Sequence, residues 1–439
     1  MPSLLAQTDP AWKSVFDKIN TEVQTNSRAY ATLEDAINKI GHRLTGSPNG
    51  EKAEEYVYNL LKSYGYTVKY QPFEVESWSR KSLKTSIGPG SNHSEVKSVA
   101  LAHSPVNADV AGELVDMGNG LEEDYAKSFG KVKGKIALVY LGILPGTSGK
   151  NLHRSEKAAL AITNGAKGII IYNTVPGGVL LTGTASVTGK LIPIPAICIS
   201  LEDGQILTNR LKTETLNARI EMTNFSGMIK ARNVIATLKG TTIPNEKILV
   251  GGHLDSWDLA TGAIDNGIGS FSIIDMARTF SALKLRPKRT IEFILFMGEE
   301  QGLLGSKSYV KNALQDGSIN QIRYMLNYDM TNDPQGFATS NDASRMLFQG
   351  IGGMAALIDT SFKNLYSTGA GLHSDHEPFM LQGVPVGGAA GGTLPNNSGR
   401  CYHADCDHFD LVDEQGMKNT VRFNSMLIYG LANAKTLAA

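Results

Sequence analysis

From Gly227 to the C-terminal end, the chain alternates short apolar runs with longer stretches of helical periodicity. Apolar residues recur every three or four positions in the longer stretches, which indicates helices, and the short runs have the length of buried strands. This order predicts a largely parallel sheet with helices on both faces. The predicted strands are residues 233–238, 247–252, 291–297, 324–328 and 384–389, and the predicted helices are 267–283, 307–314, 343–362 and 413–435.

Residues that can bind metals or move protons follow these predicted strands. The carboxyl ends of parallel strands lie at one edge of a sheet, where ligands bind in open α/β folds. We therefore expect these side chains to converge although they are far apart in sequence. They are His253, Asp255, Asp265, Glu299, Glu300, Asp329 and His403.

The residue types predict a metal site. Adjacent carboxylates at the end of a buried strand, such as Glu299 and Glu300, repel each other unless a cation lies nearby. Two imidazoles and three carboxylates suit zinc, and if Asp265 bridges, five groups serve two ions. One of the two adjacent glutamates must then stay off the metals and act as the general acid/base. Asp255 is placed to accept the second ring N–H of His253. The candidate ligands are His253, Asp265, Asp329, His403 and one of the pair Glu299 and Glu300.

Length and composition narrow the class of protein. A chain of 439 residues predicts two domains. Lys plus Arg and Asp plus Glu number 42 each, so no charge excess indicates a nucleic-acid partner. No apolar stretch approaches the roughly 20 residues of a membrane span. The first residues lack an intact signal peptide, while Asn-X-Ser triplets at Asn92, Asn224 and Asn396 favour an exported chain, so both a secreted or lumenal and a cytoplasmic location stay open.

The first half of the chain predicts an inserted domain. Helical patterns fill residues 12–64 and are interrupted by a basic turn from Gly41 to Ser47. Short strands then dominate, including 99–103, 112–117, 135–141, 168–172, 192–199 and 216–222. We therefore predict a catalytic domain of residues 1–77 and 228–439, with a mostly β insert of residues 78–227 between its two parts. Cys198 lies in an apolar run and is expected in the core, whereas Cys401 and Cys406 form either a short disulfide or two buried thiols.

Several short motifs together resemble the co-catalytic zinc exopeptidases of family M28. They are His253-Leu254-Asp255-Ser256-Trp257-Asp258, Gly262-Ala263-Ile264-Asp265-Asn266-Gly267, Gly298-Glu299-Glu300-Gln301-Gly302, Asn327-Tyr328-Asp329-Met330 and Tyr402-His403. The first is similar to the carboxypeptidase Q branch, and residues 130–139 and 165–173 resemble the protease-associated insert of that branch.

The resemblance implies a three-layer α/β/α fold with a mixed, mostly parallel sheet and an inserted, mostly β protease-associated domain. It assigns His253, Asp265 and Asp329 to one Zn²⁺ and Asp265, Glu300 and His403 to a second, so that each chain binds two. It makes Glu299 the general acid/base and gives Tyr402 a part in holding the tetrahedral intermediate. It also implies a cis peptide after Asp265, a homodimer and a dipeptide or short-peptide substrate.

The loops around His376 and His403 leave the substrate polarity open. The resemblance to carboxypeptidase Q makes a dipeptidase the leading interpretation, and a free substrate carboxylate then needs a cation such as Arg400. The segment 372–379 resembles aminopeptidases instead, in which acidic residues such as Asp375 or Glu377 hold the α-amino group. Asp375 and His376 are therefore predicted to bind substrate.

Two further alternatives concern the final ligand and the protein class. His403 is preferred over His376 and His408 as a ligand because a tyrosine precedes it, and Asp407 is expected to fix the loop rather than to bind metal. Transferrin-receptor-like proteins use this architecture as non-catalytic binding modules that have lost metal ligands. Here every ligand position is filled, which favours an enzyme.

Overall fold

The computed structural model describes residues 8–369 and 371–437 and divides the chain into two compact units. The first comprises Met1–Glu74, Lys230–Gly399 and Asp407–Ala439, and the second comprises Val75–Ile229 and Arg400–Cys406. The chain passes between the units close to the predicted boundaries at 77/78 and 227/228. The return of 400–406 to the second unit is not foreseen by the sequence. Residues 1–7, which carry the expectation about a signal peptide, lie outside the described ranges.

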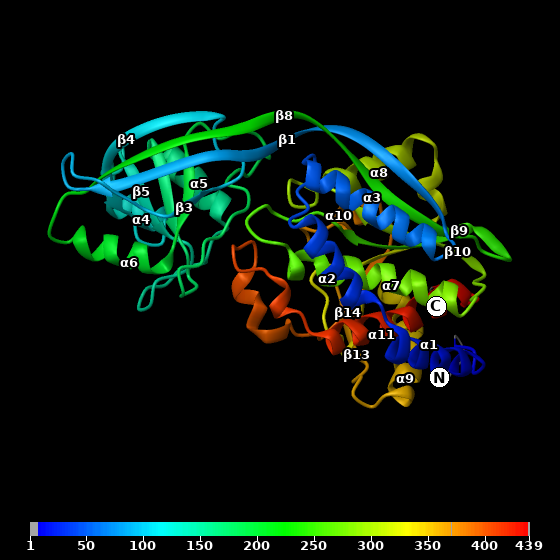
Figure 1. The fold of residues 1–439 in the computed structure, drawn as a ribbon. Coiled ribbons are helices and arrows are strands. Elements are labelled where there is room, and N and C mark those ends of the chain that lie inside the picture. The colour runs from blue at the N-terminus through cyan, green and yellow to red at the C-terminus, as the bar shows by residue number, and fades with distance from the viewer. Residues whose placement is uncertain (1–7, 370, 438–439) are drawn as a thin grey trace. The chain divides into compact units, whose positions relative to one another are not determined.

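A mixed sheet with parallel central strands forms the middle layer of the first unit (Figure 1). β9 lies between β10 and β11 and is parallel to both, and β14 is parallel to β11. β8 and β12 are antiparallel to their neighbours β10 and β14. The predicted mostly parallel sheet is thus confirmed. The order is β13 (Leu365–Thr368), β12 (Gly336–Thr339), β14 (Val386–Ala390), β11 (Ile322–Asn327), β9 (Ile243–His253), β10 (Arg289–Phe296) and β8 (Asn217–Leu238).

Helices cover both faces of this sheet. On one face α7 places Phe280 against Phe293 of β10, and α11 packs beside α7. On the other face Phe296 of β10 contacts Tyr309 of α8 and Phe379 of α10. Side chains alternate across a strand, so the fully buried β10 contributes to both cores. The helices are α1 (Trp12–Asn26), α2 (Ala29–Ile40), α3 (Pro48–Ser63), α7 (Ile268–Ala282), α8 (Leu304–Gln315), α9 (Arg345–Ile358), α10 (Glu377–Met380) and α11 (Glu414–Asn433).

The second unit has its own smaller sheet, in the order β8-β4-β5-β6-β7-β3. β5 and β6 are fully apolar central strands that run parallel to each other, and Cys198 of β7 is completely buried as expected. The elements are β1 (Thr67–Gly88), β2 (Ser94–Glu95), β3 (Ser98–Ala100), β4 (Asn107–Asp116), α4 (Glu122–Lys127), β5 (Ile136–Tyr140), α5 (Arg154–Thr163), β6 (Gly168–Tyr172), β7 (Ala196–Ile199) and α6 (Leu201–Arg210).

The main difference from the predicted elements concerns β8. The sequence predicts separate strands at 216–222 and 233–238, whereas the structure has one strand, Asn217–Leu238. Less and more exposed residues alternate through Gly227 without a turn, so the backbone stays extended there. β12 and β13 are also absent from the prediction, because runs of four residues give too little periodicity to detect.

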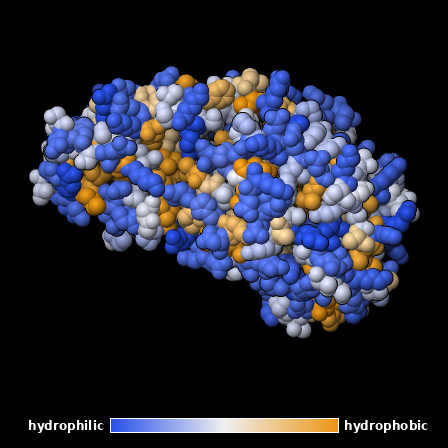
Figure 2. Space-filling view, viewed as in Figure 1, coloured by the Kyte–Doolittle hydropathy of each residue, from blue (hydrophilic) through white to orange (hydrophobic). Residues whose placement is uncertain are grey.

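The hydropathy of the surface is as expected from the composition. Hydrophilic residues dominate the face drawn in Figure 2, and hydrophobic residues are scattered between them. Among the helices of residues 8–369 and 371–437, none is both long enough and apolar enough to cross a membrane.

Candidate metal centre

Neighbouring strands of the first unit bring three of the predicted ligands together. His253 is the last residue of β9, Asp329 lies two residues after β11, and Asp265 lies in a short irregular helix, η2 (Ala263–Gly267), just before α7. Since β9 and β11 are parallel neighbours, their carboxyl ends meet at one edge of the sheet. One possible ligand atom from each of these three residues lies within 4.8 Å of the other two.

His253 lies at the centre of this group and is only 1% exposed. Its Nε2 atom is 3.3 Å from a carboxylate oxygen of Asp265, 3.4 Å from one of Asp329 and 3.9 Å from one of Glu299. Within the described chain this buried nitrogen makes no hydrogen bond of acceptable geometry. A buried ring nitrogen that lacks a hydrogen bond and is surrounded by carboxylate oxygens is a suitable set of ligands for a cation.

The spacing of these atoms fits zinc. Zinc binds nitrogen and oxygen at about 2.0–2.1 Å in a tetrahedral arrangement, which separates its ligands by about 3.3 Å. The distances from His253 to Asp265 and Asp329, 3.3 and 3.4 Å, agree with that value. Carboxylate oxygens of Asp265 and Glu300 also lie within 4.8 Å of each other, so Asp265 has a second carboxylate partner.

The electrostatics of the cluster also suit a cation. Burial lowers the pKa of His253, but the carboxylates of Glu299 and Asp329, together with Asp255 and Asp265, raise it well above its ordinary value. Burial raises the pKa of Glu299 well above its ordinary value, against the effect of His253 and with the help of other carboxylates. Both shifts have the same cause, the gathering of several carboxylates around one buried imidazole.

Backbone hydrogen bonds fix the segment that carries Asp265. The carboxylate of Asp407 accepts the N–H of Ile264 at 2.7 Å and the N–H of Asp265 at 3.0 Å. This confirms that Asp407 fixes a loop, and burial raises its pKa to about 7. The peptide between Asp265 and Asn266 is cis, as the resemblance implies.

Asn266 is a structural residue that the sequence does not single out. It is completely buried and donates from its side-chain amide to the carbonyl oxygens of His253, at 3.2 Å, and Tyr328, at 2.9 Å. Its own side-chain oxygen accepts the N–H of Met330 at 2.8 Å. Asn266 therefore links His253 to the residues on both sides of Asp329. In the sequence, the only sign of this role is that Asn266 directly follows Asp265.

Asp255 has a different role from the predicted one. The ring Nδ1 of His253 is 3.0 Å from the backbone carbonyl oxygen of Asp255, whereas the nearest carboxylate oxygen is 3.6 Å away. The carboxylate instead accepts the N–H groups of Glu299 and Glu300, at 3.2 and 3.3 Å. Asp255 thus orients His253 through its backbone and holds the glutamate pair through its side chain.

The predicted residues of the 400–406 segment belong to the second unit. Cys401 and Cys406 form a disulfide, which closes this segment into a short loop. The rings of Tyr402 and His403 are stacked, with centroids 3.9 Å apart, and Tyr402 is 43% exposed. His403 has a left-handed backbone (φ +51°), and its carbonyl oxygen accepts the N–H of Thr182. Arg400 is exposed.

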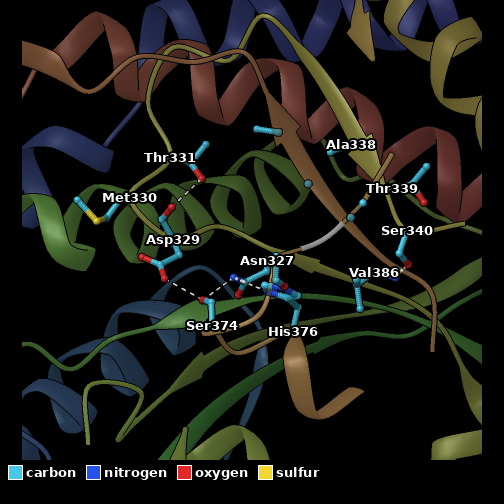
Figure 3. Close-up of a pocket in the computed structure, with 15 residues that line it drawn as sticks. Asn327, Asp329, Met330, Thr331, Ala338, Thr339, Ser340, Ser374, His376 and Val386 are labelled. Carbon is cyan, nitrogen blue, oxygen red and sulfur yellow. Dashed lines mark hydrogen bonds between the residues drawn. The ribbon is translucent and has the colours of Figure 1, made fainter. Parts of the chain in front are cut away.

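A pocket of about 370 Å³ opens beside Asp329 (Figure 3). Ser374 donates to the carboxylate of Asp329 and accepts from Asn327, both at 2.8 Å, and His376 lies beside Asn327. His376 therefore lines the pocket. Asp375 has no exposed surface and is not among the residues that line this pocket, and burial raises its pKa to about 7.

Known proteins with this arrangement are peptidases. Residues 233–428 match the model of peptidase family M28, and residues 110–207 match the PA domain. A probable leucine aminopeptidase 2 of Arthroderma benhamiae is 30% identical over 360 residues, which cover 79% of this chain and 68% of that protein.

Solved structures give the same fold over nearly the whole chain. A peptidase M28 precursor from Shewanella amazonensis has a TM-score of 0.84 at 24% identity and covers 98% of this chain and 99% of its own. A zinc aminopeptidase from Bacillus subtilis has a TM-score of 0.71 at 24% identity, with coverages of 92% and 95%. The carboxypeptidase Q branch is not singled out by these findings. The chain belongs to peptidase family M28, and it is a metallo-exopeptidase with an inserted PA domain.

Proposed function

We propose that this protein is a two-zinc aminopeptidase that removes the N-terminal residue of short peptides. The observation that carries the hydrolytic part is the buried Nε2 atom of His253, which has carboxylate oxygens of three residues 3.3 to 3.9 Å away. Similarity to leucine aminopeptidases favours the amino end of the substrate over the dipeptidase that the sequence first suggests.

Five residues would hold the two zinc ions. His253, Asp265 and Asp329 form the first group, and their spacing supports this assignment. The second ion would share Asp265 and take Glu300 together with His403, which the 400–406 segment supplies. The support for the second group is the proximity of Asp265 to Glu300 and the match of Tyr402-His403 to the family motif.

The remaining acid of the site would move protons. Zinc ions, when bound, lower the pKa of water and polarise the substrate carbonyl. Glu299 would take a proton from the attacking water and pass it to the leaving nitrogen. Glu299 can do so because Asp255 holds its backbone near the cluster while its side chain remains outside the ligand set. Tyr402 would donate a hydrogen bond to the tetrahedral intermediate.

The charge of the pocket beside Asp329 supports an amine rather than a carboxylate at this end of the substrate. The described residues that line it include Asp329 and His376 but no lysine or arginine. A protonated α-amino group would therefore find an acceptor there, whereas a free carboxylate would find no strong cation. Met330, Ala338 and Val386 add apolar surface that suits a first residue such as leucine.

Substrates blocked at either end test this proposal. Leu-Ala-Ala should be cleaved after leucine. The same peptide with an amidated C-terminus should be cleaved there at a comparable rate, because an aminopeptidase does not bind the C-terminal carboxylate. N-acetylation should abolish cleavage, because it removes the charge of the amine. The opposite pattern, in which amidation but not acetylation abolishes cleavage, would establish the carboxypeptidase-type alternative. Arg400 would then be the predicted partner of the substrate carboxylate.

We also propose that the protein is exported. The disulfide between Cys401 and Cys406 favours an oxidising compartment. Asn92 is exposed and could carry a glycan. Asn396 is exposed, but its side-chain amide donates to the carbonyl oxygen of Leu411, and Asn224 is 2% exposed and donates to that of Pro105. A homodimer stays a prediction from the resemblance. A non-catalytic binding protein is not favoured, since every predicted ligand is present.

A further inference from the structure

Arg43 is a buried cation beside the acidic cluster for which the proposed chemistry has no role. It lies in the basic turn between α2 and α3 and is 1% exposed. Burying a charged side chain costs several kcal/mol unless partners compensate it. A residue placed there for packing alone would not need a guanidinium.

The guanidinium of Arg43 binds both ends of the loop that joins two proposed ligands. Nε donates to the carbonyl oxygen of Leu254 at 2.6 Å, directly after His253. Nη1 and Nη2 donate to the carbonyl oxygens of Thr261 and Gly262, both at 2.8 Å, just before the segment that carries Asp265. One planar group thus fixes the distance between the two ends of this loop.

The turn that carries Arg43 is itself attached to the same loop. The backbone N–H of Arg43 donates to the hydroxyl oxygen of Ser256 at 2.9 Å. Gly262 has a left-handed backbone (φ +59°), and a Cβ atom there would lie 2.2 Å from Ser256, so the loop is closely packed at this point. Asp407 holds the amides of Ile264 and Asp265 on the following residues.

The surrounding carboxylates keep Arg43 charged. Burial lowers its pKa to about 10, and Asp407, Asp255, Asp265 and Glu300 oppose this decrease. The guanidinium is therefore cationic at neutral pH, and it offsets part of the negative charge that the proposed ligands bring together.

We propose that Arg43 is a positioning residue that fixes the backbone between His253 and Asp265 and thereby sets the affinity of the centre for zinc. This inference rests on the proposed function, because it concerns the same metal ligands. The three nitrogens of the Arg43 guanidinium point to carbonyl oxygens at both ends of the loop, whereas a lysine would present all its donors from one nitrogen, a compact point charge on a single stem.

The test compares Arg43→Lys with Arg289→Lys. Arg289 is a matched control because it is also buried, at 4%, and its guanidinium also binds backbone carbonyl oxygens, those of Leu431 and Ala434. It lies at the start of β10, at the opposite end of the strand from the glutamate pair. Both substitutions keep the positive charge but replace the planar guanidinium, with its separate donor nitrogens, by a single ammonium group. Zinc affinity is measured by competition with a fluorescent chelator, and stability by urea unfolding of the metal-free proteins.

We expect Arg43→Lys to weaken zinc binding about 10- to 100-fold, the range known for residues that support metal ligands. Its kcat should fall at limiting zinc and recover at least partly when zinc is in excess, with KM little changed. Arg289→Lys should lose stability but keep the wild-type zinc affinity. Ser256→Ala, a milder change that removes only the anchor of the turn, should shift zinc affinity in the same direction by a smaller factor.

Two results would overturn the inference. Zinc affinity of Arg43→Lys within two-fold of the wild type would make the residue purely structural. If Arg43→Lys does not fold, wild-type affinity in Ser256→Ala would have the same meaning. Failure of the proposed function looks different: the wild-type protein itself would then bind no zinc or cleave no unblocked peptide.

Discussion

At the scale of single residues, chemically identical side chains have separate roles because their hydrogen bonds differ. Glu299 and Glu300 are adjacent, and the carboxylate of Asp255 accepts the backbone N–H of both. Glu300 approaches Asp265, whereas Glu299 faces His253 at 3.9 Å. The first is therefore proposed as a ligand and the second as the proton carrier.

Replacing Glu299 by Gln should lower kcat by about 10²- to 10⁴-fold, because general acid–base catalysis contributes that much. The zinc content should stay at the wild-type level, since an amide of the same shape leaves the ligands in place. Glu300→Gln is the contrasting variant and should lose the second of the two proposed zinc ions, because Glu300 is one of its ligands. Wild-type turnover in Glu299→Gln with metal retained would remove Glu299 from this role.

At the scale of elements, a partly buried ion pair joins two helices of the first unit. Arg422 on α11 is 3% exposed, and its guanidinium lies 2.7 Å from the carboxylate of Asp359, which follows α9. Burial would raise the pKa of Asp359, but hydrogen bonds from Ser361 and the charge of Arg422 lower it from 3.8 to about 2. The charged form of Asp359 therefore stabilises the contact between α9 and α11.

Asp359→Asn should lower the free energy of unfolding by about 1–2 kcal/mol at pH 7. A carboxyl whose pKa is lower in the folded state stabilises it fully above about pH 4, and this contribution disappears as the pH falls towards 2. The difference between wild type and variant should therefore shrink below pH 4 in urea titrations. Asp342→Asn, at the exposed pair with Arg345, serves as the control and should have little effect. An equal difference at pH 7 and pH 3 would exclude the carboxylate charge as the cause.

At the scale of the whole molecule, the proposed centre takes its ligands from distant parts of the sequence. The proposed ligands are His253, Asp265, Glu300, Asp329 and His403. Because the native state binds zinc through groups that are dispersed in the unfolded chain, bound metal should stabilise the fold.

Elemental analysis should find two zinc ions per wild-type chain and one in His403→Ala. Removing zinc with a chelator should abolish peptide hydrolysis and lower the melting temperature, since a ligand at about 1,000 times its Kd contributes about 4 kcal/mol. Restored zinc should reverse both effects. One zinc ion in the wild type, or two in His403→Ala, would contradict the proposed second group.

The sequence alone determined the fold class and most of the candidate site. Strand and helix periodicity are local properties, so the parallel order and the helices around it could be read directly. Since parallel strands end at one edge, placing His253 at the end of β9 and Asp329 just after β11 was enough to predict that they meet. The family motifs then identified the peptidase.

Only the tertiary structure decided how the ligands are held. The contact from Arg43 to Leu254 spans 211 positions and that from Asp407 to Asp265 spans 142, so no local pattern reveals them. The same holds for Asn266, which links two strand ends, and for Asp255, whose carboxylate binds the backbone of the turn after β10. Periodicity shows which residues are buried, but the partner of a buried polar group depends on which distant segments pack against it.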